Sequence, residues 1–104
     1  MASKKSRPFD AAKYLDDDEA VAEYINEALL TYDIDAITYA IGMAAKARGM
    51  SQIAQQAGLS RESLYKALSG DGNPQFETVV RVLTALGLQL LTEPASDSGD
   101  KHAA

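Results

Sequence analysis

One segment of the chain, residues 51–68, has the spacing of two short helices joined by a tight turn. It runs Ser51-Gln52-Ile53-Ala54-Gln55-Gln56-Ala57-Gly58-Leu59-Ser60-Arg61-Glu62-Ser63-Leu64-Tyr65-Lys66-Ala67-Leu68. Ala54 is small enough to let the two helices approach, Gly58 permits the left-handed backbone of a tight turn, and Leu64 can lock the second helix into a core. This spacing predicts a helix-turn-helix; a plain helical hairpin in a small α-helical bundle is the alternative.

The second helix of this pair would expose long polar side chains near its N-terminus, the end that enters the major groove in helix-turn-helix proteins. Arg61 can make a bidentate contact with guanine, Glu62 can accept a hydrogen bond from cytosine N4, and Lys66 can reach a base or a phosphate. Donors at the start of the preceding helix and backbone N–H groups in the loop that follows can contact phosphate. The candidate DNA-binding residues are Ser51, Gln52, Ser60, Arg61, Glu62, Ser63, Tyr65, Lys66 and Asn73.

Apolar residues at helical spacing continue on both sides of this segment, so the sequence predicts an all-α fold of about five helices. The expected ranges are 17–32, 35–48, a short helix beginning at residue 51, 60–69 and 75–86. Carboxylates at residues 16–19 suit the start of the first helix, and Asp35, Ser51 and Ser60 are expected to cap the next three. The last helix is expected to bury Phe76 with the apolar residues that follow it.

The apolar segment Leu88–Thr92 follows a helix stop at Gly87 and is expected to form either a last β-strand or a buried extended tail. A lone strand is unstable, so a strand here would pair with a second chain and help to form a dimer. The candidate dimerisation residues are Phe76, Val80, Leu83, Leu88, Leu90 and Leu91. The expected organisation is a flexible N-terminal tail over 1–13, one domain over 14–92 and a disordered C-terminal tail over 93–104.

Charge is distributed unevenly along the chain. The net charge is −5, which alone argues against nucleic acid as a partner. Residues 8–35 carry nine carboxylates against one lysine, whereas residues 36–73 carry four basic residues against two carboxylates. Such asymmetry suggests two different partner surfaces, an acidic one and a mildly basic one. The run of carboxylates at residues 16–19 lacks the spacing of a calcium loop, so a solvated first turn is preferred to a metal site.

Several classes of protein are excluded by composition. The 104 residues suit one domain, and the absence of cysteine removes disulfides, thiolate zinc sites and thiol nucleophiles. No apolar run is long enough to span a membrane, and the basic start has no apolar region of a secretory signal, so a cytoplasmic location is expected. The single histidine, His102, lies in a polar tail, and Ser63 has no base beside it. We therefore expect no enzyme, no cofactor and no metal.

Four stretches of the sequence together resemble a known family. They are Gly49-Met50-Ser51-Gln52-Ile53-Ala54, residues 58–68, Gly72-Asn73-Pro74-Gln75-Phe76 and Ala85-Leu86-Gly87-Leu88. The chain resembles the antidote (antitoxin) proteins of chromosomal addiction modules, HigA-like proteins with a lambda-repressor-like (XRE-type) helix-turn-helix, over about residues 14–92. The resemblance implies a repressor of its own operon that neutralises a small, basic, ribonuclease-like toxin encoded beside it. It also places Arg61, Glu62 and Lys66 on the recognition helix.

A basic toxin would be complemented by an acidic surface, so the acidic first helix is the candidate toxin-binding segment. Its candidate residues are Asp16, Asp17, Asp18, Glu19, Glu23 and Glu27. The expected partners are double-stranded operator DNA, the toxin and a second copy of the chain. Two alternatives remain: a stand-alone phage-type repressor without a toxin, and a protein–protein interaction module whose helix-turn-helix never meets DNA. The weak positive charge of the central segment leaves the second alternative open, because phosphate contacts normally supply much of the affinity for DNA.

Overall fold

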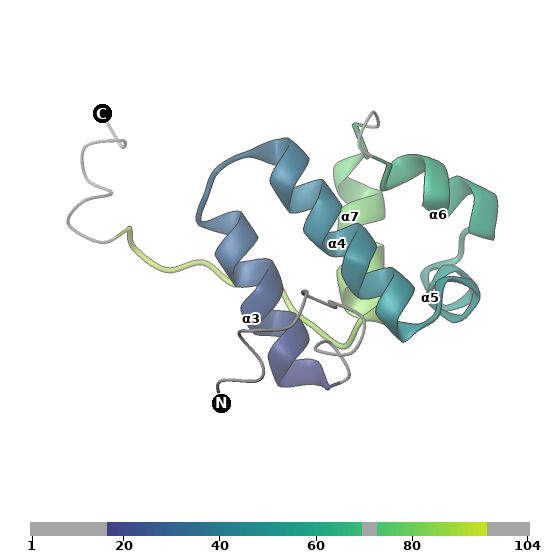
Figure 1. Cartoon of the computed structure of the whole chain (residues 1–104), viewed down its shortest axis with the longest axis horizontal. Coiled ribbons are helices and arrows are strands. Elements are labelled where there is room, and N and C mark those ends of the chain that lie inside the picture. Colours follow the sequence, from purple (N-terminus) through teal and green to yellow (C-terminus); the bar gives the residue numbers. More distant parts are fainter. Residues whose placement is uncertain (1–16, 70–72, 96–104) are drawn as a thin grey trace, which may run out of the picture.

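The structure is a computed structural model that describes residues 17–69 and 73–95 (Figure 1). These residues form helices and connecting segments, with no strand among them, so the predicted all-α fold is confirmed. The helices are α3 (Asp18–Leu29), α4 (Ile34–Arg48), α5 (Met50–Ala57), α6 (Arg61–Ala67) and α7 (Phe76–Ala85). None of the helices in the described ranges is long and apolar enough to cross a membrane.

Side-chain caps fix where three of the helices begin. The Asp17 carboxylate accepts a hydrogen bond from the Ala20 backbone N–H at 2.8 Å, and the Ser60 hydroxyl accepts one from the Ser63 N–H at 3.0 Å. Two predicted caps are wrong. Asp33, not Asp35, caps α4, because helical geometry begins at Ile34, two residues earlier than in a helix capped by Asp35. Gly49, not Ser51, is the N-cap of α5, and it provides no side-chain hydrogen bond.

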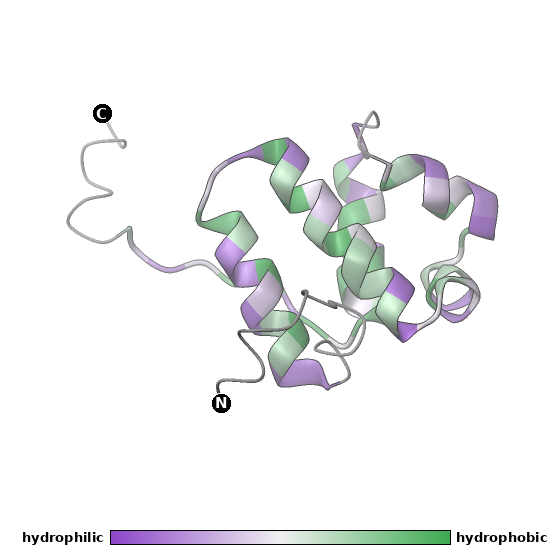
Figure 2. Cartoon of the chain, viewed as in Figure 1, coloured by the Kyte–Doolittle hydropathy of each residue, from purple (hydrophilic) through white to green (hydrophobic). Residues whose placement is uncertain are grey.

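The core lies where α4, α5 and α7 meet, with α3 covering α4 and α6 covering α5. The side chains that are buried most completely come from several helices: Val21, Ile41, Leu64, Val82 and Leu86. In Figure 2 the hydrophobic residues follow the inner stripes of α4 and α7, while α6 carries hydrophilic residues on its outer side. Burial of this apolar surface holds the short helices α5 and α6, which would be marginal alone.

The turn between α5 and α6 is fixed from both sides. Gly58 adopts the expected left-handed backbone with φ of 76°, and the Leu59 N–H donates to the Ala54 carbonyl at 2.8 Å. The Arg81 side chain of α7 donates to the Ala57 carbonyl at 3.3 Å and lies against the open side of Gly58, where a Cβ would come within 3.0 Å of it. The position of α6 relative to α5 therefore depends on α7 as well as on the turn.

The C-terminal segment differs from the sequence-based expectations. Within the single chain that the structure describes, residues 88–95 form no strand, and of the apolar ones only Leu88 packs partly against the core. Leu90 and Leu91 are exposed, so the buried tail is not observed. Phe76, expected in the core, is 73% exposed, because it lies in the first turn of α7 at the edge of the apolar stripe.

Some predictions fall outside the described residues. They are the N-terminal tail over 1–13, the carboxylate of Asp16, most of the loop over 70–73, His102 and most of the tail over 93–104. The proposed domain limits stay a prediction.

Candidate nucleic-acid interface

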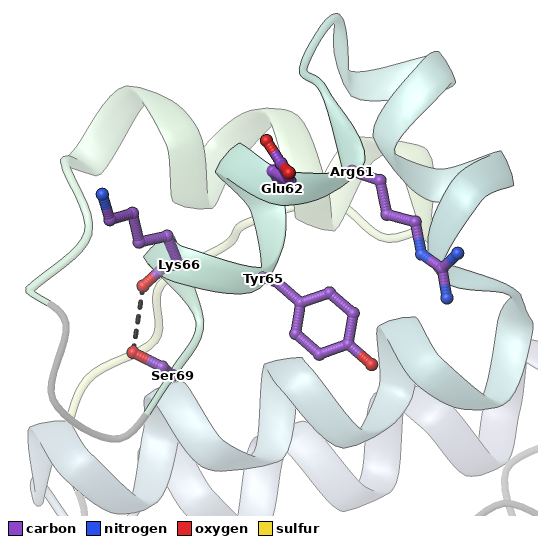
Figure 3. A pocket seen from close by; sticks show the side chains of 5 residues that line it. All are labelled: Arg61, Glu62, Tyr65, Lys66 and Ser69. Carbon is purple, nitrogen blue, oxygen red and sulfur yellow. Dashed lines mark hydrogen bonds between the residues drawn. The ribbon is translucent and has the colours of Figure 1, made fainter.

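Five polar or aromatic residues of α6 and its C-terminal end line an open surface hollow, which we call the α6 surface. They are Arg61, Glu62, Tyr65, Lys66 and Ser69 (Figure 3). In Figure 3 the side chains of Arg61 and Tyr65 extend toward the same side of α6, above α4, whereas Lys66 extends away from them. Four of the nine predicted DNA-binding residues thus meet in one hollow, because Leu64 and Leu68 turn the opposite side of α6 into the core.

Two cations lie near the ring of Tyr65. The Arg61 guanidinium carbon lies 5.8 Å from the centre of the Tyr65 ring, and the Lys46 ammonium of α4 lies 6.0 Å from it. Both distances suit a cation–π interaction. The aromatic ring therefore brings a basic side chain of another helix to the α6 surface and orients Arg61 along it.

Lys46 is a member of this site that the sequence analysis missed. It lies 15 or more residues from every predicted recognition residue of α6, so spacing within the helix-turn-helix could not find it. A lysine in the last turn of a helix is also ordinary, since it is favoured there by the helix macrodipole. The one signal in the sequence that could have indicated Lys46 is that it is the first basic residue after Lys13, at the start of the basic central segment.

The cations of the described residues divide into two groups. Arg48 pairs with Asp18 of α3, and Arg81 pairs with Glu77 at 2.7 Å, so these two arginines are engaged within the fold. Lys46, Arg61 and Lys66 form no ion pair with any carboxylate in residues 17–69 and 73–95. Glu62 is the one carboxylate on the α6 surface. The net charge of the chain is negative, yet within the described ranges the cations without a carboxylate partner gather around α6.

The predicted DNA-contacting hydroxyl and amide side chains around the α6 surface differ in whether they are already engaged within the fold. The Ser60 hydroxyl donates to the Ser63 hydroxyl at 2.9 Å and accepts from its backbone N–H, so both serines are committed to the N-terminal cap of α6. Ser51 and Gln52 are exposed in the first turn of α5. Asn73 is exposed and lies after residues 70–72, which are outside the described ranges. This arrangement leaves Ser51, Gln52 and Asn73 open to solvent.

The acidic residues of α3 also divide into two groups. Asp17 caps the helix and Asp18 pairs with Arg48, so both have structural partners. Glu19, Glu23 and Glu27 are exposed and follow one another at four-residue spacing, which places them along one side of α3. Like charges at this spacing destabilise an isolated helix, so this glutamate stripe offers the helix no stabilisation of its own.

The predicted dimerisation residues are not equally available. Leu83 is buried in the core of its own chain and Leu88 packs against that core, so neither presents a free side chain to a second copy. Phe76, Leu90 and Leu91 are exposed, and Val80 is half-buried.

Comparison with known proteins adds two matches. A family model described as "Probable addiction module antidote protein" matches residues 5–94, so the resemblance begins closer to the N-terminus than residue 14. A protein of Haemophilus influenzae described as uncharacterized is 51% identical over 87 residues, covering 84% of this chain and 90% of that relative. No solved structure matches the chain.

Proposed function

Because the chain belongs to the family of probable addiction module antidote proteins, we propose that it is the antitoxin of a type II toxin–antitoxin module. In this role it binds and neutralises a small, basic, ribonuclease-like toxin encoded beside it. It also represses its own operon as a dimer, through a lambda-repressor-like (XRE-type) helix-turn-helix formed by α5 and α6. It acts in the cytoplasm, where its operator lies, and has no catalytic role of its own.

The family match over residues 5–94 is the observation that carries the antitoxin role. The antidote of an addiction module must have a toxin to neutralise, which implies a protein partner. A toxin that acts on RNA must be basic to hold phosphate, so a partner that blocks it benefits from negative charge. The glutamate stripe of α3, Glu19, Glu23 and Glu27, is the described acidic surface that has no cationic partner within the fold.

The α6 surface supports the DNA-binding role. Arg61 and Glu62 are exposed in the first turn of α6, the end of a recognition helix that meets the edges of the bases, where Glu62 can accept a hydrogen bond from cytosine. Lys66 is exposed in the last turn of α6 and can reach a base or a phosphate. Lys46 adds a cation from α4 that can reach the DNA backbone. No carboxylate of the described residues pairs with these cations. Burying them in an interface would cost free energy unless the partner supplies an anion, as a DNA phosphate does.

The direct test of the antitoxin role uses the protein encoded beside this chain. That protein and the chain are produced separately, and RNA cleavage by the former is measured as the chain is added. We expect copurification of the two proteins and loss of cleavage near equal amounts. Stable binding to operator DNA with no association between the two proteins would instead support the stand-alone repressor. Association without any DNA binding would support the interaction module.

A further inference from the structure

The turn between α3 and α4 exposes a set of apolar side chains, which we call the turn patch: Leu29, Leu30, Tyr32 and Ile34. Leu30, Tyr32 and Ile34 are 70%, 65% and 61% exposed, so most of their surface lies in water. Figure 2 shows hydrophobic residues at the end of α3 and at the start of α4, on either side of the turn. A run of exposed apolar residues within six positions of the sequence is unusual for a surface that meets only solvent.

The turn is held in one conformation by its own hydrogen bonds. The Thr31 hydroxyl donates to the Ala28 carbonyl at 2.6 Å and accepts from the Asp33 N–H at 3.0 Å, and Asp33 then caps α4. Tyr32 has φ of 59°, a left-handed conformation that is uncommon for a bulky residue. The turn patch is therefore presented by a fixed backbone, which reduces the ordering cost of binding.

Exposed carboxylates precede and follow the turn patch in the sequence, and no basic residue lies near it there. Glu23 and Glu27 lie on the same side of α3 as Leu30, while Asp33 and Asp35 flank Ile34. Between Lys13 and Lys46 the sequence contains no lysine, arginine or histidine. An apolar centre with an acidic rim has the composition of an interaction surface whose partner is basic.

Two other occupants fit this surface less well. A second copy of the chain related by a two-fold axis would bring the same patch, and therefore the same carboxylates, face to face. DNA is excluded by the sign of the charge. The turn patch and the α6 surface also lie along different parts of α4. Ile34 begins the helix, whereas Leu68 at the end of α6 packs on Gly42, 8 residues or about 12 Å further along. Lys46, beside Tyr65, is 12 residues or about 18 Å from Ile34 along the helix. Figure 1 shows the α3–α4 turn and α6 on opposite sides of the molecule.

We propose that the turn patch, with Glu23, Glu27, Asp33 and Asp35 around it, is the docking surface for a basic protein, the toxin of the proposed function on which this inference rests. Leu30 and Ile34 supply apolar contact at the centre, and the carboxylates steer the partner and exclude a second copy. Because this surface and the α6 surface are far apart, the chain can hold the toxin and DNA at the same time.

The test compares three forms of the full chain for their affinity to the purified protein encoded beside it, measured by calorimetry. The first is the wild type, the second carries Leu30→Ser and Ile34→Ser, and the third carries Leu30→Met and Ile34→Val. Since both side chains are mostly exposed, the serine variant should keep the melting temperature and DNA binding of the wild type. We expect it to lose about tenfold or more in affinity, whereas the conservative variant keeps most of its affinity.

The outcomes separate this inference from the proposed function. If the wild type binds the neighbouring protein and the serine variant binds it equally well, the docking surface is wrong and the antitoxin role stands. If the wild type does not bind it, both proposals fall. If the serine substitutions change the mass of the chain alone in light scattering, the patch is an interface between copies, which also overturns the inference.

Discussion

The two serines that begin the predicted helices of the helix-turn-helix have different roles in the structure. Ser60 caps α6 with its side chain, while Ser51 lies exposed in the first turn of α5 and caps nothing. Serine before an apolar run gave the correct N-cap for α6 and the wrong one for α5, where the N-cap is Gly49. Side-chain chemistry alone could not decide between them.

The different roles of Ser60 and Ser51 can be measured as different changes in the free energy of unfolding. Ser60→Ala should lower the free energy of unfolding by about 1 kcal/mol, because the Ser63 N–H loses its acceptor. Ser51→Ala is the matched control and should change it by less than about 0.5 kcal/mol. Urea unfolding of both variants gives the comparison. Equal losses would show that the α5 helix begins at Ser51 after all.

Tyr24 makes stability depend on alkaline pH. Burial raises the pKa of its phenol above the ordinary value of 10.0, and the nearby Tyr39 raises it further. The folded state then holds the phenol proton more tightly than the unfolded chain does. The contribution of Tyr24 to the free energy of unfolding is therefore full below pH 10 and is lost as the pH rises through the pKa of the folded state. Tyr24→Phe should therefore reduce the loss of stability between about pH 8 and about pH 11. Parallel pH profiles for the two proteins would contradict this assignment.

Within the helices, hydrophobic periodicity predicted well which side chains are buried, but it did not predict how far along each helix the core extends. Val21 and Ile25 of α3 and Leu83 and Leu86 of α7 are buried as their spacing predicts. Phe76 is exposed although it has the same apolar character, because the first turn of α7 extends past the core. Hydrophobic spacing gives the direction of a side chain but not whether another element lies opposite to it.

The pair of helices α5 and α6 and the turn between them were recognisable because their sequence signals are local, whereas the contacts that α4 and α7 make with them were not. Gly58 and Leu64 act within a few residues of one another. Lys46 and Arg81 reach the motif only through tertiary packing. Contacts of this kind have no spacing signature in a single sequence.

The glutamate stripe of α3 makes a prediction about the rate of toxin binding. Replacing Glu19, Glu23 and Glu27 by glutamine should slow association with the neighbouring protein several-fold at low salt, with the difference shrinking as salt rises. Dissociation should change less. Glu93→Gln, an exposed carboxylate outside α3, should leave the rate unchanged. Stopped-flow association rates check this, and an unchanged rate for the glutamine variant in low salt would return the stripe to a solubilising role.

Across the whole molecule, the acidic α3 and the basic α6 surface lie on different sides, as the proposed binding of two different partners requires (Figure 1). The net charge of −5 gives no sign of this separation, but the charges counted separately over residues 8–35 and 36–73 do. Phe76, Leu90 and Leu91 are also exposed, at the two ends of α7, and they are the available side chains for the proposed contact with a second copy. In the proposed repressor, one recognition helix with few cations would bind DNA weakly, so we expect specific affinity to need two half-sites, about 34–36 Å apart in two-fold repressors.

The dimer can be tested through its exposed leucines. Leu90→Asp should shift the chain from dimer to monomer at micromolar concentration, because it places a charge at an apolar interface, and DNA affinity should fall with it. The melting temperature in dilute solution should hold, since Leu90 is outside the core. Light scattering measures the change. A monomeric wild type, or a variant that remains dimeric, would contradict the proposed interface.

Binding of the DNA that precedes the chain's own gene tests the central claim most directly. In gel shifts at fixed salt, the wild type should bind this DNA more tightly than a shuffled sequence. Arg61→Ala should weaken binding by about 1–3 kcal/mol and relax specificity at one base pair across operator variants. A wild type that does not distinguish the two DNAs, or an Arg61→Ala variant that binds every operator variant as the wild type does, would contradict the account.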